Sequence, residues 1–160
     1  MQNNHIVIFT DGAALGNPGP GGYGAVLMYG HHRKELSDGY RLTTNNRMEL
    51  LAVIMALKNI KVPGIEIHVY TDSKYVCDAV EKRWIYGWRA KGWAKVKNVD
   101  LWQMFFPLFE QLKPKFHWVK GHAGIVENER CDFLATTAAQ AKPVKIDTGY
   151  ENSRDNGSLL

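Results

Sequence analysis

The stretch HIVIFTDGAALGNPGPGGYGA, from His5 to Ala25, decides the fold of this chain. It begins with the apolar run Ile6–Phe9, which is typical of a strand buried on both faces and which leads into a single acid, Asp11. The glycine- and proline-rich turn over residues 16–22 reverses the chain and leaves peptide N–H groups available to an anion. An acid beside such a turn indicates a site for phosphate and metal. For Asp11 alone, an ordinary strand-ending turn is the alternative.

The composition predicts one soluble globular domain, which we expect in the cytoplasm. The chain has 160 residues, of which 45% are hydrophobic and 22% are charged. No apolar run is long enough to predict a membrane span, and the start MQNNHIVIF lacks the features of a signal peptide. Cys77 and Cys131 show no metal-ligand spacing, which favours reduced packing residues. The formal charge of +4 is compatible with a polyanionic partner.

The next segments predict a hairpin followed by a helix. Residues 24–29 and 33–42 are typical of two strands in an antiparallel meander. A helix then begins after the capping residues Thr43–Asn46 and extends to about Asn59, with Glu49 in its first turn. Because the helix dipole favours an acid there, Glu49 by itself does not indicate a site.

The alternating segment 65–70 predicts a further strand, which ends next to Asp72. A helix over about residues 74–82 follows it. Because a helix also precedes this strand, a βαβ unit is favoured, in which the strand lies parallel to the first one. Asp11 and Asp72 would then reach the same edge of the sheet. The alternative is that Asp72 or Ser73 only caps the helix.

The segment 81–102 combines aromatic and basic side chains. It holds four of the five tryptophans, which are Trp84, Trp88, Trp93 and Trp102. Basic side chains bind phosphates and exposed aromatic rings stack on bases, so the segment predicts a nucleic-acid-binding protrusion. The alternative is an amphipathic helix pair whose tryptophans belong to the core, although Gly87 and Gly92 interrupt the helical pattern. We expect some of both.

The last third predicts a helix over residues 100–112, a strand over 115–119 and a final helix over 127–141, which carries Asp132. A glycine-flanked loop between the last two elements has His122 at its tip. A lone histidine is usually a surface residue, but a titrating side chain on a mobile loop can also serve as a proton shuttle.

The chain shows no internal repeat and no second domain. Residues 143–160 have little apolar content and no periodicity, which predicts a disordered tail after a folded domain over residues 1–142.

Four acids stand at element boundaries that can converge, namely Asp11, Glu49, Asp72 and Asp132. Packed together, four carboxylates repel one another and take up protons unless divalent cations neutralise them. Ligands that are all oxygen favour Mg²⁺ or Mn²⁺ over zinc. Two such ions would clamp the attacking and leaving oxygens of a phosphodiester. Spacing alone does not select these four from the sixteen acids of the chain.

Five blocks of sequence, in order, resemble the signature motifs of type 1 ribonuclease H, the bacterial ribonuclease HI family. They are FTDGAALGNPGPGGYGA, TTNNRMEL, YTDSKYV, KNVDLWQ and VKGHAG followed by ENERCDFLA. The resemblance extends from about His5 to Ala141, so only the tail lies outside the catalytic domain that it implies. It implies an α/β protein with the ribonuclease H-like fold, in which helices flank a mixed five-stranded sheet.

The resemblance also implies an activity, which is hydrolysis of the RNA strand of RNA/DNA hybrids with two Mg²⁺ ions, leaving 3′-hydroxyl and 5′-phosphate ends. Mn²⁺ is a possible substitute. The residues that match the family's catalytic, metal-binding carboxylates are Asp11, Glu49, Asp72 and Asp132. His122 matches the loop histidine associated with proton transfer or product release.

Substrate contacts are implied in the same way. The positions that match the family's minor-groove contacts, where RNA 2′-hydroxyls can be read, are Gly12, Asn17, Asn45 and Asn46. Thr44 and Asn98 match a pocket for a DNA phosphate, and Trp84 with the basic segment that includes Lys91 matches the protrusion that holds the DNA strand.

Three other functions compete with this one. They are a hybrid-binding module that does not cut, a strand-transfer or junction-cleaving nuclease of the same fold, and a glycosidase with paired carboxylates. The full set of four acids argues against the first, the short chain against the second and the basic aromatic segment against the third. We expect a monomer with an RNA/DNA hybrid as its partner, no membrane association and no obligate protein partner.

Overall fold

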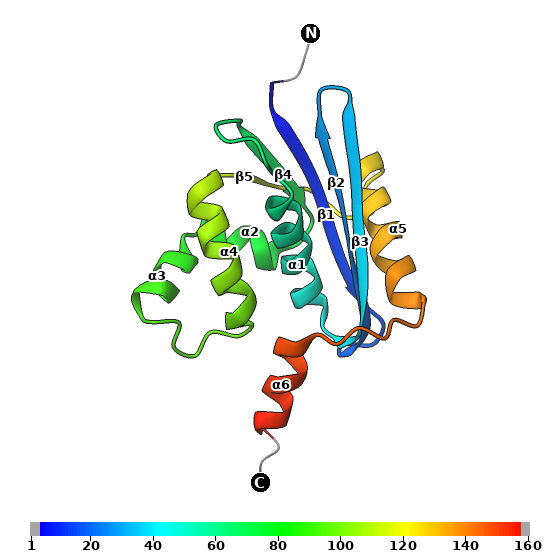
Figure 1. Cartoon of the computed structure of the whole chain (residues 1–160), viewed down its shortest axis with the longest axis vertical. Coiled ribbons are helices and arrows are strands. Elements are labelled where there is room, and N and C mark those ends of the chain that lie inside the picture. Colours follow the sequence, from blue (N-terminus) through cyan, green and yellow to red (C-terminus); the bar gives the residue numbers. More distant parts are fainter. Residues whose placement is uncertain (1–3, 158–160) are drawn as a thin grey trace.

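The computed structural model describes residues 4–157 and places a five-stranded sheet between helices (Figure 1). The strands are β1 (Ile6–Ala14), β2 (Gly19–Tyr29), β3 (His32–Thr43), β4 (Ile67–Thr71) and β5 (Lys115–Trp118). β1, β2 and β3 form an antiparallel meander, while β4 pairs parallel to β1 and β5 pairs parallel to β4. The strand order is β3-β2-β1-β4-β5. The predicted α/β fold with a mixed five-stranded sheet is confirmed.

Six helices accompany the sheet within the described residues. They are α1 (Asn45–Lys58), α2 (Lys74–Glu81), α3 (Trp84–Ala90), α4 (Val99–Leu112), α5 (Val126–Gln140) and α6 (Thr148–Gly157). α1 and α5 cover opposite faces of the sheet, α4 packs on α1, and α3 lies on the far side of α4 from the sheet (Figure 1). None of these helices combines the length and apolar character needed to cross a bilayer.

The main core lies between the sheet and α1. Alternate residues of β1 and β4, such as Ile8 and Val69, face this side and are fully buried, as is Ile54 from the predicted apolar stripe of α1. Trp102 and Phe105 extend the core from α4 with no exposed surface. Each such side chain contributes about 1.5–3 kcal/mol by leaving water, so the core fixes the strand ends that carry the acids.

Some tryptophans of the segment 81–102 belong to the core and one is exposed to a possible partner, so both interpretations of this segment apply in part. Trp102 is fully buried, and Trp88 and Trp93 pack against the core as partly buried side chains. Trp84, the first residue of α3, is 47% exposed, and Lys91 is also exposed. The structure therefore assigns most of these aromatic rings to folding and leaves Trp84 with the surrounding basic residues as the surface that a partner can reach.

The tail expected to be disordered is ordered up to residue 157. It forms α6, and Arg41 and Glu151 make a two-pronged ion pair that joins β3 to this helix, with nitrogen–oxygen distances of 2.8 and 2.9 Å. The prediction of disorder is therefore wrong for residues 143–157, while residues 158–160 of that tail lie outside the described residues.

The physical reason is a buried arginine in α1. Arg47 is 2% exposed, and its guanidinium donates to both carboxylate oxygens of Asp147 at 2.8 and 2.9 Å. It also donates to both oxygens of Asp100 at 2.8 and 2.6 Å, and the Thr43 hydroxyl donates to Asp147 at 2.7 Å. A buried charge requires such partners, so Arg47 draws the tail onto the domain.

We predict that Asp147→Ala destabilises the protein by about 3 kcal/mol, because it leaves the Arg47 guanidinium buried with one of its two carboxylates missing. Urea unfolding followed by circular dichroism measures this change. Glu151→Ala is the matched control, since it removes a tail carboxylate whose partner Arg41 is exposed. Equal shifts of the unfolding midpoint in both variants would contradict the assignment.

Candidate active site

Two acids lie side by side because β1 and β4 are parallel neighbours. Thr10 pairs with Thr71 in the register of these strands, and the next residue in each is Asp11 and Asp72. Ser73 caps α2 by accepting a hydrogen bond from the Val76 N–H, so the capping alternative holds for Ser73. Asp72 is thus left for the site.

Gly12 allows the third acid to approach. A Cβ atom at this position would lie 2.3 Å from the backbone nitrogen of Glu49 and from the carbonyl carbon of Met48, so only glycine lets α1 pack directly on β1. Thr44 caps the helix by accepting a hydrogen bond from the Arg47 N–H at 3.3 Å. Glu49 is the fifth residue of α1, just beyond the first turn where we expected it, and lies against Asp11.

The side chains of Asp11, Glu49 and Asp72 form one cluster. Each offers a carboxylate oxygen, and these oxygens all lie within 4.8 Å of one another. Asp132, on α5, adds its charge from the other side, which raises the pKa of Asp11 and of Asp72. Three of the four acids implied by the resemblance thus form one cluster, and Asp132 lies outside it but near enough to act electrostatically on Asp11 and Asp72.

The electrostatics of this cluster are unfavourable without a cation. Burial, followed by the charge of Asp72, raises the pKa of Asp11 to about 7. Burial and the charges of Asp11 and Asp72 raise the pKa of Glu49 well above its ordinary value. Burial likewise raises the pKa of Asp72, against the lowering effect of His122. Crowded, desolvated carboxylates of this kind are stabilised by a bound divalent cation.

One buried atom supports this interpretation independently. Oε2 of Glu49 is inaccessible to solvent and has no hydrogen-bond partner within the described part of the chain. A buried acceptor without a donor is costly, and a cation would satisfy it. The donor set contains only oxygen, so the residues fit Mg²⁺ or Mn²⁺.

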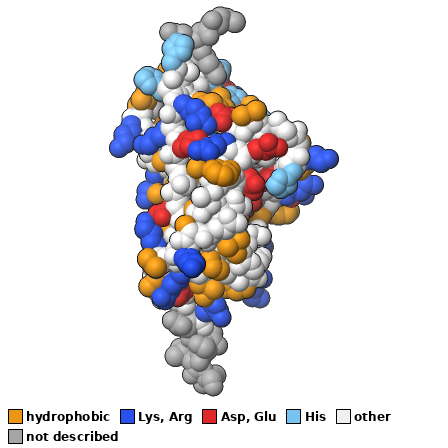
Figure 2. Space-filling model, turned by 90° about the vertical axis from the view of Figure 1, so that its right-hand side faces the viewer, with side chains coloured by type: hydrophobic (Ala, Val, Ile, Leu, Met, Phe, Trp, Pro, Cys, Tyr) orange, Lys and Arg blue, Asp and Glu red, His pale blue; other side chains and the backbone are white. Residues whose placement is uncertain are grey.

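The loop that follows β5 lies over the acids. A Cβ atom at Gly121 would lie 2.6 Å from Oδ2 of Asp72, so the loop backbone packs directly on this carboxylate. Trp118 donates its indole N–H to the Asp72 carbonyl at 3.0 Å. His122 is exposed at the tip, close enough to Asp72 to affect its charge. On the face shown in Figure 2, acidic side chains gather beside a histidine, with Lys and Arg side chains around them.

A groove between the start of α1, the segment before α4 and α6 holds four of the eight substrate contacts implied by the resemblance. Asn17, Thr44, Asn46 and Asn98 line it together. Asn45 does not line the groove but connects the start of α1 to the end of β1 and the turn after it, since its N–H donates to Oδ1 of Asn17 at 3.0 Å and its own Oδ1 accepts from Ala14 N–H at 2.6 Å. Exposed Trp84 and Lys91 lie apart from this groove, on α3 and at its C-terminal end.

Sequence reasoning missed the contribution of the tail to this groove. The tail residues that line it are Gly149, Tyr150, Asn152 and Ser153. Arg47 lies in its wall and donates to Oδ1 of Asn98 at 3.3 Å, while the Asn98 amide donates to the Tyr75 hydroxyl at 3.0 Å. No local signal marks these residues, because the tail is polar and aperiodic and its position depends on the distant Arg47.

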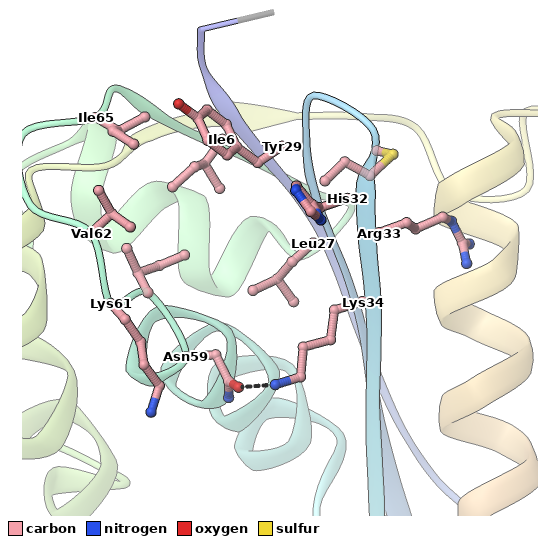
Figure 3. A pocket seen from close by; sticks show the side chains of 12 residues that line it. Ile6, Leu27, Tyr29, His32, Arg33, Lys34, Asn59, Lys61, Val62 and Ile65 are labelled. Atoms are coloured by element: carbon pink, nitrogen blue, oxygen red, sulfur yellow. Dashed lines mark hydrogen bonds between the residues drawn. The ribbon is translucent and has the colours of Figure 1, made fainter.

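A separate pocket carries no such chemistry. It lies where β1 begins, between the β2–β3 hairpin and the C-terminal end of α1, and is lined by apolar and basic residues such as Ile6, Leu27 and Lys61 (Figure 3). Lys34 donates to Oδ1 of Asn59 across it at 2.8 Å. None of the described residues that line it is acidic, and it lies at the other end of β1 from Asp11.

We predict that the metal-free protein loses stability as the pH rises from about 4 through 7. The pKa of Asp11 is about 7 in the folded state and near 3.8 when the chain is unfolded, so the folded state binds more protons in this window. The contribution of Asp11 to the free energy of unfolding is therefore fully present below pH 4 and is lost as the pH rises through 7. Urea unfolding in EDTA at several pH values measures it.

Mg²⁺ should restore the stability lost above pH 7, and Asp11→Asn should flatten the pH dependence in EDTA. Asp78→Asn, in α2, is the matched control and should keep the wild-type slope. A slope that is the same in Asp11→Asn and Asp78→Asn would contradict the assignment.

Comparison with known proteins agrees with this geometry. Residues 3–140 match the family model described as RNase H. Ribonuclease H of Shewanella amazonensis is 55% identical over 151 residues, which cover 91% of this chain and 96% of that protein. Ribonuclease H of Nitratidesulfovibrio vulgaris is 53% identical over 156 residues, covering 94% and 99%.

Solved structures give the same result. LC9-RNase H1, described as a type 1 RNase H with the type 2 active-site motif, is 31% identical with a TM-score of 0.78, over 96% of this chain and 82% of that one. LC11-RNase H1, solved in complex with an RNA/DNA hybrid, is 29% identical with a TM-score of 0.62, over 84% and 96%. On the family match and the two close relatives, the chain belongs to the RNase H family of nucleases.

Proposed function

We propose that this protein is an endoribonuclease that hydrolyses the RNA strand of RNA/DNA hybrids and leaves 3′-hydroxyl and 5′-phosphate ends. The observation that carries the proposal is the cluster of the carboxylates of Asp11, which is buried, and of Glu49 and Asp72, which are half-buried. A separate groove lined by amide side chains starts at the N-terminal turn of the helix that carries Glu49. Membership of the RNase H family and the hybrid bound by LC11-RNase H1 support the choice of substrate.

Four side chains would hold the metal, namely Asp11, Glu49, Asp72 and Asp132. Two Mg²⁺ ions, or Mn²⁺ in their place, would supply an activated water and stabilise the departing 3′-oxygen. Asp11 is central to the cluster, since it interacts with the other three acids. Because no side chain needs to bond covalently to the phosphate, the role of the chain is to position the carboxylate oxygens that would bind the metal ions.

The remaining residues would bind and orient the hybrid. Those that would follow its minor groove are Gly12, Asn17, Asn45 and Asn46. Thr44 and Asn98 would contact a DNA phosphate, and Trp84 with Lys91 would hold the DNA strand on the protrusion. Glu49, next to the RNA 2′-hydroxyl, would help to select RNA. His122 would carry a proton to or from the solvent as its loop moves.

We further propose that the protein acts as a monomer in the cytoplasm. Cys77 and Cys131 are both free and buried, which suits a reducing compartment. The four acids are neighbours within a single chain, which supports a monomeric enzyme.

The first experiment is cleavage of end-labelled RNA paired with DNA, in Mg²⁺ and in EDTA, with duplex RNA and duplex DNA as controls. We expect cleavage of the hybrid alone, dependent on Mg²⁺. Asp11→Asn should lower the rate by more than about 100-fold, as loss of a group that stabilises the transition state does. Asp78→Asn should cut normally. Hybrid binding without cleavage by the wild-type protein would show a binding module instead.

A second prediction concerns His122. His122→Ala should lower kcat about 100-fold if the imidazole transfers a proton, and should leave KM nearly unchanged because the side chain is exposed and outside the groove. Steady-state kinetics on the hybrid over a range of pH measure both parameters. His31→Ala, in the β2–β3 turn, is the matched control. A change in KM alone would assign His122 to binding.

A further inference from the structure

A second cluster of ligand-type side chains lies at the opposite end of β4 from the acids. It consists of His5, just before β1, with Glu66 and His68 at the start of β4. Each offers one ligand atom, and these atoms all lie within 4.8 Å of one another. Asp72, which directly follows β4, is four residues beyond His68, and this corresponds to about 13 Å along an extended strand. The cluster is therefore separate from the active-site carboxylates.

The carboxylate of Glu66 bridges the two imidazoles. Nδ1 of His5 lies 2.7 Å from Oε2 of Glu66, and Nε2 of His68 lies 3.5 Å from Oε1. The ring of His5 also meets that of His68 edge-on, with centroids 5.2 Å apart. One nitrogen of each histidine and one carboxylate oxygen thus lie close enough together to share one ion.

The orientation of the His68 ring is fixed by His117 of the neighbouring strand β5. Its Nδ1 lies 2.8 Å from Nε2 of His117 in β5, and the two rings stack with centroids 5.0 Å apart. Tyr70 also stacks on His117, with ring centroids 4.7 Å apart, and Phe9 stacks on Tyr70 at 5.0 Å. Histidines that bind metal usually engage their second ring nitrogen with such a neighbour, which sets the tautomer and holds the ring.

Lys115 is the competitor for Glu66. Its ammonium contacts Oε1 of this carboxylate, and its side chain is 62% exposed, so it can move into solvent. The contact with His5 uses the other oxygen, Oε2.

We propose that His5, Glu66 and His68 form a second metal site, for a transition-metal cation such as Zn²⁺, with His117 as a positioning residue. Two imidazoles and one carboxylate are typical ligands of Zn²⁺, Co²⁺ and Ni²⁺ and are a poor match for Mg²⁺. A water would complete four-coordination. The bound ion would connect the segment just before β1 to the start of β4 and so stabilise the N-terminal ends of these two strands.

The test uses the full chain in excess Mg²⁺, which keeps the oxygen-only site supplied, and Zn²⁺ or Co²⁺ alone as the probe. We expect Zn²⁺ to shift the imidazole ¹⁵N resonances of His5 and His68 and to raise the thermal unfolding midpoint by several degrees. Co²⁺ should give the strong visible absorption of a four-coordinate site.

Variants separate this site from the active site. His68→Gln and His5→Gln should each weaken Zn²⁺ binding at least about tenfold, and His117→Gln about tenfold through the orientation of His68. His31→Gln, in the β2–β3 turn, is the matched control and should bind normally, as should Asp11→Asn. The proposal is overturned if Zn²⁺ shifts only the resonances of His122 or if the affinity for Zn²⁺ is unchanged in both His5→Gln and His68→Gln. It is also overturned if Asp11→Asn abolishes Zn²⁺ binding.

Discussion

The parallel pairing of β1 with β4 is the constraint on which the rest of the molecule depends. It brings Asp11 and Asp72 to one edge of the sheet, and the close contact at Gly12 then sets α1, with Glu49, against the same edge. The backbone thus forces three carboxylates into a space where they repel one another. The core beneath these strand ends is fully buried, and its favourable free energy offsets the repulsion in the absence of a metal. A bound cation would neutralise the repulsion directly.

Most of the fold could be predicted from the sequence because its signals are local. Apolar alternation, glycine-rich turns and helix caps mark the strands and α1, and the rule for βαβ units gives the parallel pairing. The four acids could be chosen only through the resemblance of whole motifs, since spacing alone does not rank them. The shift of Glu49 beyond the first helical turn is within the uncertainty of any sequence-based helix start.

The parts that could not be predicted depend on contacts between distant residues. α6 is polar and weakly amphipathic, and it is ordered because Asp147 meets Arg47, one hundred positions earlier. The histidines at the start of β1 and β4 carry no common motif and meet only because the strands are neighbours. The tryptophans of the basic segment looked similar in sequence, and only packing separates buried Trp102 from exposed Trp84.

The ion-pair network of Arg47 has a consequence for how the groove holds a polyanion. Asp100 and Asp147 together carry more charge than the one guanidinium they surround. Apart from Lys97, the groove wall therefore offers amide and hydroxyl donors, rather than cations, to a bound phosphate. Neutral donors displace few of the counterions condensed on a nucleic acid. The ionic-strength dependence of binding would then come from the basic side chains around α3, and the groove would contribute shape and hydrogen bonding that persist in high salt.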